Sequence, residues 1–193
     1  MANKIKSVAV YCGHEFGNNP EYVRDARKIG ELLARNKITM VFGGGDVGLM
    51  GTTAESALEN GGEVIGISTQ HVMSKNEPLH EGINVKVVDG LSTRKEEMFE
   101  LSDAFIILPG GIGTLDEMTD ILTKQQVGES CKPILIMNTA KYWEIFGQVL
   151  THMEQEGFIQ SLSDYNIIVA NTPTELIDIL LDADNLVTTC KAL

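Results

Sequence analysis

Residues 104–117 read Ala-Phe-Ile-Ile-Leu-Pro-Gly-Gly-Ile-Gly-Thr-Leu-Asp-Glu, an apolar run followed by a glycine-rich turn. The run 104–108 has the composition of a buried strand, and a helical pattern begins near Leu115. The glycines therefore lie where a strand turns into a helix. Such a turn presents free backbone N–H groups at the positive end of a helix, where phosphate groups bind. The stretch predicts an α/β fold with a phosphate site at this turn.

A second glycine-rich turn, Gly43-Gly44-Gly45-Asp46-Val47-Gly48, follows the strand-like run 38–42. Its glycines match the G-x-G-x-x-G dinucleotide fingerprint. However, the turn follows the second strand, and the next strand ends at Ser68-Thr69-Gln70, where a ribose-binding Asp or Glu would be expected. No Gly-Lys-Ser/Thr follows the glycines, so the turn is not a Walker A loop. A phosphate site of the mononucleotide type accounts for the glycines and leaves fewer expected residues missing.

Strand-like runs and helical patterns alternate along the whole chain. We expect strands near residues 6–11, 38–42, 63–67, 84–88, 104–108, 133–137 and 166–169. We expect helices near residues 21–35, 49–59, 94–101, 115–126, 141–155 and 174–181. This succession predicts a single-domain, Rossmann-like, doubly wound parallel sheet of about seven strands with helices on both faces. The segment 68–82 has no clear period and is expected to be a mobile loop, which is either a plain surface connection or a cover for the ligand.

Composition limits the classes of function. The 193 residues fit one domain, placed at 1–182, with a loosely ordered tail at 183–193. A net charge of −12 argues against a broad nucleic-acid or anionic-membrane surface, although a nucleotide ligand needs only local donors. Cys12, Cys131 and Cys190 are odd in number, far apart in the sequence and without the spacing of metal ligands, which indicates reduced thiols. We expect a cytoplasmic protein with no metal, no cofactor and no membrane span.

Two interpretations are open for the acidic residues after the glycine turn. Thr114 and Glu117 fit the S/T-x-x-E capping box, in which the glutamate only bonds back to the helix N-terminus. Alternatively, Asp116, Glu117 and Asp120 lie beside the phosphate site, where carboxylates are favoured only if a cationic group is also present. An oxocarbenium-like sugar would be such a group.

The adjacent cations Arg94-Lys95 bear on the same question. Ser92-Thr93 can cap a helix that begins there, which would place both cations in its first turn. The helix dipole disfavours cations at that end by about 0.3–1 kcal/mol each. An anion bound between them would account for the placement; alternatively they are solvated and offset by Glu96-Glu97.

Together these features closely resemble the Lonely Guy family, the cytokinin riboside 5′-monophosphate phosphoribohydrolases, which were often mislabelled as lysine decarboxylases. The resemblance covers nearly the whole chain and is carried by the run 41–51, Arg94-Lys95, residues 100–104 and the Pro109-to-Glu117 motif. It implies hydrolysis of the N-glycosidic bond of a purine nucleoside 5′-monophosphate, AMP or an N6-modified AMP, to free base and ribose 5-phosphate. It also implies a homodimer or higher homo-oligomer.

The resemblance further implies the residue roles. Arg94 and Glu117 match the catalytic pair of the family. The residues that it places at the substrate are Gly13, Gly44, Gly45, Leu91, Lys95, Gly110, Gly111, Ile112, Gly113, Thr114 and Thr123.

The chain departs from the family pattern at several positions. The first strand of the family usually ends Cys-Gly-Ser-Ser, whereas this chain has Cys12-Gly13-His14-Glu15. Thr69 replaces a common proline, and Lys124 replaces a common aromatic residue. The catalytic pair is intact, but the base preference is left open. A non-catalytic nucleotide-binding or sensing module is therefore the main alternative. A lysine decarboxylase would need a pyridoxal-phosphate lysine, which no motif marks.

Overall fold

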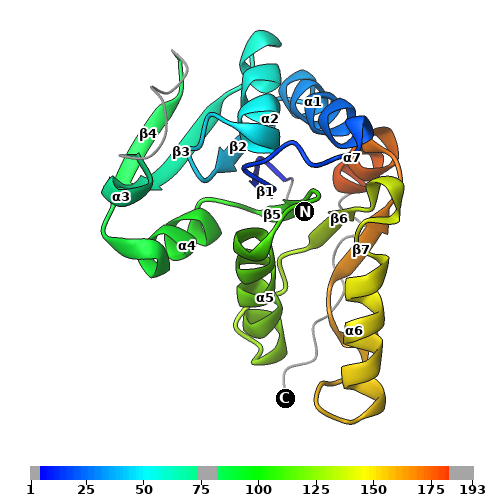
Figure 1. Cartoon of the computed structure of the whole chain (residues 1–193). Helices are drawn as coiled ribbons and strands as arrows, with labels where there is room; N and C mark the ends of the chain where they lie inside the picture. Colours follow the sequence, from blue (N-terminus) through cyan, green and yellow to red (C-terminus); the bar gives the residue numbers. More distant parts are fainter. Residues whose placement is uncertain (1–4, 74–81, 183–193) are drawn as a thin grey trace.

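A seven-stranded parallel sheet lies between two layers of helices in the computed structural model, which describes residues 5–73 and 82–182 (Figure 1). The strands are β1 (Ser7–Tyr11), β2 (Thr39–Phe42), β3 (Val64–Thr69), β4 (Asn84–Val88), β5 (Ala104–Ile107), β6 (Ile134–Met137) and β7 (Ile167–Ala170). The helices are α1 (Pro20–Arg35), α2 (Gly48–Glu59), α3 (Gln70–Met73), α4 (Gly90–Glu100), α5 (Ile112–Gln126), α6 (Glu144–Gln155) and α7 (Pro173–Leu181), with short 3₁₀ turns η1 (Thr139–Lys141) and η2 (Leu162–Asp164). The predicted fold class is confirmed.

The order of the strands in the sheet locates its ligand-binding edge. The order is β4-β3-β2-β1-β5-β6-β7, so the winding reverses between β1 and β5. These two strands pair in parallel from Val8 with Ala104 to Tyr11 with Ile107. In open α/β sheets, ligands bind beyond the carboxyl ends of the strands at such a reversal. The loop after β5 therefore lies where a ligand is expected.

Successive strand residues point to opposite sides of the sheet, and in the central strands both sides are buried under helices. On one face, Val8 and Val10 belong to a core shared with α1, α2 and α7. On the other face, Ala9 and Tyr11 belong to a core shared with α4 and α5. This two-sided burial explains why the central strands β1, β2, β5 and β6 are mostly continuous apolar runs.

Three predicted element boundaries were wrong. Helix α4 begins at Gly90 instead of near 94, and α5 begins at Ile112 instead of near 115. Helix α6 begins at Glu144 instead of near 141, since Ala140 and Lys141 have positive φ angles of 50° and 63°. Residues in the left-handed region cannot continue an α-helix.

The segment 68–82 is also more ordered at its start than expected. Ser68 and Thr69 complete β3, where they pair with Val87 and Val88 of β4, and α3 follows directly. The prediction of an irregular loop was therefore wrong for residues 68–73. The rest of that prediction falls largely on residues 74–81, and the predicted tail 183–193 also lies outside the described residues.

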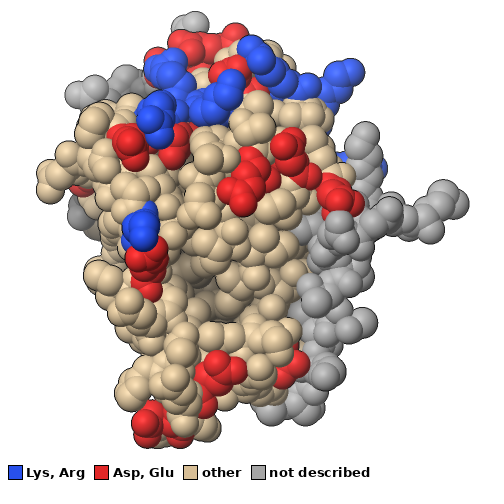
Figure 2. Space-filling view, turned by 90° about the vertical axis from the view of Figure 1, so that its right-hand side faces the viewer, with Lys and Arg blue, Asp and Glu red and all other residues tan. Residues whose placement is uncertain are grey.

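Helix α6 differs from the other long helices because none of its residues is buried. Ile145, Val149 and Met153, spaced four residues apart on this helix, are 73%, 42% and 41% exposed. Phe158 and the edge-strand residue Val169 are 80% and 52% exposed. We call these five residues the α6 face. The side of the molecule that carries α6 has a hollowed middle with few charged side chains (Figure 2). Within the described ranges, no helix has the length and apolar character needed to cross a membrane.

Candidate functional site

A cavity of about 360 Å³ lies at the carboxyl edge of the sheet, where β1 and β5 meet. Its wall includes the start of α5, the loop after β1 and the side chains of α4 and α5 that face the sheet edge. The lining residues are Cys12, Gly13, His14, Met50, Arg94, Gly111, Ile112, Gly113, Thr114 and Glu117.

The start of α5 forms part of the wall of this cavity. Gly111 is the N-cap residue, and Ile112, Gly113 and Thr114 form the first turn. Amides of a first helical turn have no acceptor within their own helix. Because the N-cap is a glycine, it has no side-chain oxygen to occupy them. Together with the helix dipole, these N–H groups favour a bound phosphate or carboxylate.

Close backbone packing explains the glycines beside this turn. A side chain at Gly110 would collide with the hydroxyl of buried Thr114 and with the backbone of Gly13. The amide of Gly13 donates to the carbonyl of Pro109 at 3.0 Å, and its carbonyl accepts from the amide of Leu49 at 3.1 Å. The loops after β1 and β5 and the start of α2 are therefore joined by backbone hydrogen bonds.

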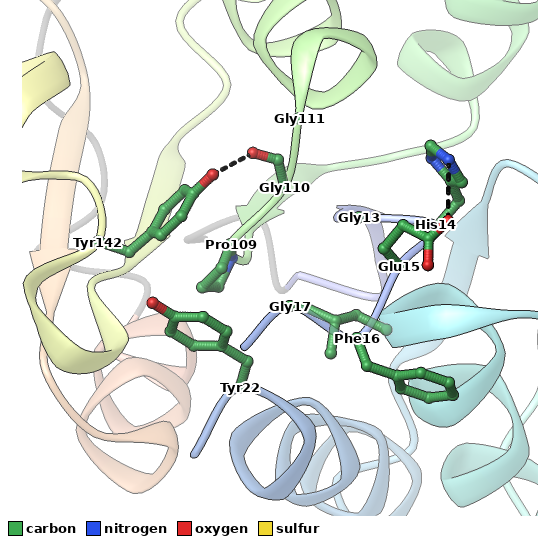
Figure 3. Close-up of a pocket in the computed structure, with 11 residues that line it drawn as sticks. Gly13, His14, Glu15, Phe16, Gly17, Tyr22, Pro109, Gly110, Gly111 and Tyr142 are labelled. Atoms are coloured by element: carbon green, nitrogen blue, oxygen red, sulfur yellow. Dashed lines mark hydrogen bonds and ion pairs between the residues drawn. The ribbon is translucent and has the colours of Figure 1, made fainter. Parts of the chain in front are cut away.

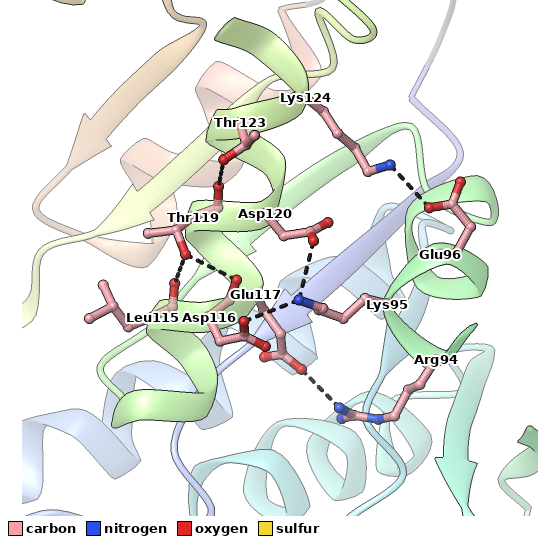
Figure 4. Close-up of polar contacts among 10 residues, drawn as sticks. All are labelled: Arg94, Lys95, Glu96, Leu115, Asp116, Glu117, Thr119, Asp120, Thr123 and Lys124. Carbon is pink, nitrogen blue, oxygen red and sulfur yellow. Dashed lines mark hydrogen bonds and ion pairs between the residues drawn. The ribbon is translucent and has the colours of Figure 1, made fainter. Parts of the chain in front are cut away.

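Arg94 and Glu117 form a largely buried ion pair in the cavity (Figure 4). Arg94 Nη1 lies 3.1 Å from Glu117 Oε1, and the two side chains are 13% and 11% exposed. Arg94 Nε also donates to the carbonyl of Ile67 at 3.0 Å. A side chain at Gly43 would collide with the guanidinium group, so the glycine turn after β2 makes room for Arg94.

Two local interpretations of these residues were wrong. Thr114 lies inside the first turn of α5, so it is not the N-cap, and the Glu117 carboxylate accepts from Arg94 instead of completing a capping box. Arg94 is the fifth residue of α4, so it is not in the first turn, where the helix dipole would act on it. The Ile67 carbonyl and the Glu117 carboxylate hold Arg94 in place.

Burial controls the protonation of Glu117. It raises the pKa of Glu117 to about 7, although the charge and hydrogen bond of Arg94 oppose this rise. The neighbouring charge of Asp116 adds a small further rise. Near neutral pH this group therefore exchanges a proton readily, as a general base or acid must. Burial likewise raises the pKa of the Cys12 thiol, which favours its neutral form.

Several predicted binding residues lie outside the described lining of this cavity. Lys95 Nζ contacts Asp116 and Asp120 at 3.1 and 3.2 Å (Figure 4). Partial burial opposes the charge of Lys95, but these hydrogen bonds raise its pKa above the ordinary value. The hydroxyl of Thr123 donates to the Thr119 carbonyl at 2.8 Å, and Thr123 lines a different pocket.

Of the remaining predicted binding residues, some line the cavity and others lie around it. Leu91 is 59% exposed on the first turn of α4. Gly44 has a φ of +74°, a conformation that favours glycine, and lies against Ser68. Gly45 follows it in the same buried turn. Gly13 and the segment 111–114 do line the cavity, whereas Gly110 lies just outside it.

A second pocket, of about 210 Å³, is lined by Pro109, Gly110 and Gly111 of the glycine loop and shares Gly111 with the first cavity (Figure 3). The hydroxyl of Tyr142 donates to the Gly110 carbonyl there at 2.6 Å. His14 Nε2 and Glu15 Oε1 lie 3.8 Å apart near its rim, with side chains that are 74% and 82% exposed. This pair marks the departure from the family pattern, and it lies beside the cavity because His14 lines both spaces.

Sequence reasoning missed three features that shape the site. The Ile67 carbonyl is a backbone group and leaves no signal in the sequence. The contact between Gly43 and Arg94 and that between Tyr142 and Gly110 join residues far apart in the chain. The close approach at Gly43 was signalled only by the glycine itself, which was interpreted as part of a phosphate-binding turn.

Comparison with known proteins gives two kinds of match. Residues 50–180 match a family model described as a possible lysine decarboxylase. A cytokinin riboside 5′-monophosphate phosphoribohydrolase of Rhodococcoides fascians is 39% identical over 85% of this chain and 83% of its own length. One from Arabidopsis thaliana is 34% identical over 94% of this chain and 85% of its own length.

Solved structures share the fold. The molybdenum cofactor binding protein of Rippkaea orientalis superposes with a TM-score of 0.66 at 23% identity, covering 93% of this chain and 97% of that chain. The Moco carrier protein of Chlamydomonas reinhardtii gives a TM-score of 0.69 at 19% identity, covering 96% and 100%. Identity this low supports the fold alone, whereas the curated relatives identify the family. The chain belongs to the Lonely Guy family of cytokinin riboside 5′-monophosphate phosphoribohydrolases.

Proposed function

We propose that this protein hydrolyses the N-glycosidic bond of a purine nucleoside 5′-monophosphate to the free base and ribose 5-phosphate. The observation that carries the proposal is the buried Arg94–Glu117 pair in the same cavity as the free amides of α5. The activity in the names of the curated relatives supports the same reaction.

The start of α5 would bind the 5′-phosphate. The amides of 111–114 and the helix dipole supply donors without a mobile side chain, so little reorganisation is needed. Binding energy from this remote group can then hold the ribose against Glu117 and lower the barrier at the reacting bond. A nucleoside without the phosphate should be a poor substrate.

Glu117 would act at the reacting carbon. As the bond between C1′ and the base nitrogen breaks, its electron pair leaves with the base and positive charge develops on the ribose C1′–O4′ unit. The carboxylate stabilises this charge most strongly where water is excluded, and Glu117 is largely buried. It also accepts a proton from the attacking water, whose oxygen bonds to C1′. The departing base takes up a proton from solvent, and Glu117 then returns the proton of the attacking water to solvent.

Arg94 would have two effects on this step. Its positive charge lowers the pKa of Glu117 against the effect of burial, so that more of the carboxylate is ionised. Its bonds to the Ile67 carbonyl and to Glu117 also orient that carboxylate. Arg94 is therefore assigned both an electrostatic and an orienting role.

The proposed substrate is AMP or an N6-modified AMP. The exposed His14-Glu15 pair replaces two small hydroxyl residues of the family pattern beside the cavity, and we expect it to influence base preference. The same change is what favours the alternative function, a nucleotide-binding or sensing module without turnover.

We also propose that the protein forms a homodimer through the α6 face. This face exposes apolar side chains at helical spacing on α6, beside the edge strand β7. An apolar face that stays exposed among the described residues is typical of a protein–protein interface. A second copy would bury it on both subunits.

Chromatographic detection of released base tests the proposed reaction. Purified protein is incubated with AMP and with isopentenyladenosine monophosphate, and both the base and ribose 5-phosphate are quantified. Equal amounts of the two products are expected. Tight AMP binding without any base release would contradict hydrolysis and favour the sensing module.

A further inference from the structure

We propose that Tyr142 is a positioning residue that fixes the Gly110–Gly111 peptide and thereby aims the Gly111 amide at the bound anion. The Tyr142 hydroxyl donates to the Gly110 carbonyl at 2.6 Å, a short distance for such a bond (Figure 3). The identity of the anion, the 5′-phosphate, rests on the proposed function. The orientation of the Gly111 amide does not depend on that proposed function.

Peptide geometry links the two ends of this contact. The Gly110–Gly111 peptide is planar and trans, so the Gly111 N–H points opposite to the Gly110 carbonyl. The carbonyl is directed toward Tyr142, in the 210 Å³ pocket. Gly111 lines that pocket and also the cavity that holds Glu117. Holding the carbonyl toward Tyr142 therefore turns the Gly111 amide away from Tyr142, and we infer that it then faces the cavity.

Gly110 and Gly111 have no side chains that could fix the conformation of the peptide between them, so a contact from elsewhere is needed. Glycine is required at 110, where any side chain would meet Thr114, and Gly111 has open space around its missing side chain. A peptide between two glycines has more rotational freedom than any other. A hydrogen bond from outside the loop restricts that freedom before the anion arrives, which lowers the entropy cost of binding.

The ring of Tyr142 is itself held in place by aromatic contacts. It packs edge-on against Tyr22 at 5.6 Å and against Trp143 at 5.0 Å between ring centroids. The Trp143 amide donates to Asn138 Oδ1 at 2.9 Å. Tyr142 therefore has a defined position although it is 39% exposed.

The turn before Tyr142 is strained, and a buried contact holds it. Ala140 and Lys141 have φ angles of 50° and 63°, and non-glycine residues in this region cost about 1–3 kcal/mol each. Thr139 Oγ1 donates to Asp25 Oδ2 at 2.8 Å, and both residues are buried. Strain of this kind persists only where the surroundings fix it, and it often occurs next to functional sites.

Two matched variants test the inference. Tyr142→Phe removes the hydroxyl and keeps the ring, while Tyr22→Phe removes a hydroxyl from the neighbouring ring of the same pocket. Binding of inorganic phosphate and of ribose 5-phosphate is measured by calorimetry, and steady-state kinetics are measured with AMP and adenosine. Thermal unfolding shows whether each variant is folded.

For Tyr142→Phe we expect about 3- to 10-fold weaker binding of both anions, the effect of one hydrogen bond. KM for AMP should rise by the same factor, with kcat within about 2-fold and kcat/KM for adenosine unchanged, because only the phosphate uses the amide. Tyr22→Phe should match the wild type in all of these quantities.

Unchanged anion affinity in a folded Tyr142→Phe protein would overturn the inference, as would an equal loss in Tyr22→Phe. A wild-type protein that binds neither anion would overturn it as well. Failure of the proposed function is a separate result: a wild-type protein that binds phosphate in a Tyr142-dependent way but releases no base would keep the positioning role and lose the hydrolysis.

Discussion

Glu117 meets two conditions that favour proton transfer near neutral pH and that a surface carboxylate does not meet. It is largely buried, and its partner is an arginine that is held independently by a backbone carbonyl. Burial raises its pKa to about 7, so the group is partly ionised at neutral pH. A capping-box glutamate would be bonded to its own helix instead. The contact with Arg94 therefore distinguishes the two interpretations of this residue.

Replacing Glu117 by Gln should keep the fold and most of the nucleotide binding but lower kcat by about 10²- to 10⁴-fold, because shape is conserved and charge is lost. Base release and AMP binding are measured side by side. The matched control is Glu129→Gln, an exposed carboxylate beyond the end of α5. Normal turnover in a Glu117→Gln protein would disprove the catalytic role.

Activity should depend on the ionisation of Glu117. Since the carboxylate is the active form in the proposed mechanism, kcat/KM for AMP should rise with pH and level off above about 7, the pKa of this group. Arg94 lowers that pKa, so in Arg94→Gln the residual activity should need a higher pH. A rate profile that falls through pH 7, or an acid shift in the variant, would contradict this assignment.

At the scale of elements, the two glycine turns differ in their contacts. The turn after β5 presents amides at the start of α5, as its sequence predicts. A second phosphate site at the turn after β2 stays a prediction; in the structure Gly43 leaves room for the Arg94 guanidinium and Gly44 lies against Ser68. A glycine needed for close approach of a side chain has the same sequence signature as one that approaches a ligand.

Gly43→Ala should push Arg94 away from Glu117 and lower kcat/KM by about 10- to 100-fold while the protein stays folded, with a stability loss of about 1–3 kcal/mol from overpacking. A double-mutant cycle gives the control: in an Arg94→Gln background, Gly43→Ala should cost little further activity. Additive losses in the cycle would show that Gly43 does not act through Arg94.

At the scale of the whole molecule, the sequence predicted the fold well because parallel strands buried on both faces are continuous apolar runs. The sequence also predicted that a phosphate-binding turn and the carboxylate of Glu117 would follow β5. It misplaced the starts of α4 and α5, since glycines at helix starts were interpreted as part of the preceding turns. The contacts of Arg94 with Ile67 and of Tyr142 with Gly110 depend on tertiary packing, which no local pattern encodes.

The proposed homodimer gives a prediction at this scale. Ile145→Glu on the α6 face should convert dimers into monomers in analytical ultracentrifugation, because a buried unpaired carboxylate opposes association. Val87→Glu is the matched control, since Val87 is 45% exposed on β4 at the opposite edge of the sheet. A wild-type monomer, or a dimer that survives Ile145→Glu, would contradict an interface at this face.

The central claim is that the cavity cleaves a nucleoside 5′-monophosphate with Glu117 as its carboxylate. The most direct measurement compares base release from AMP and from adenosine by the wild type and by Glu117→Gln. We expect release from AMP, much lower kcat/KM for adenosine, and loss of the AMP reaction in the variant. Equal rates with AMP and adenosine, or full activity in Glu117→Gln, would contradict the account.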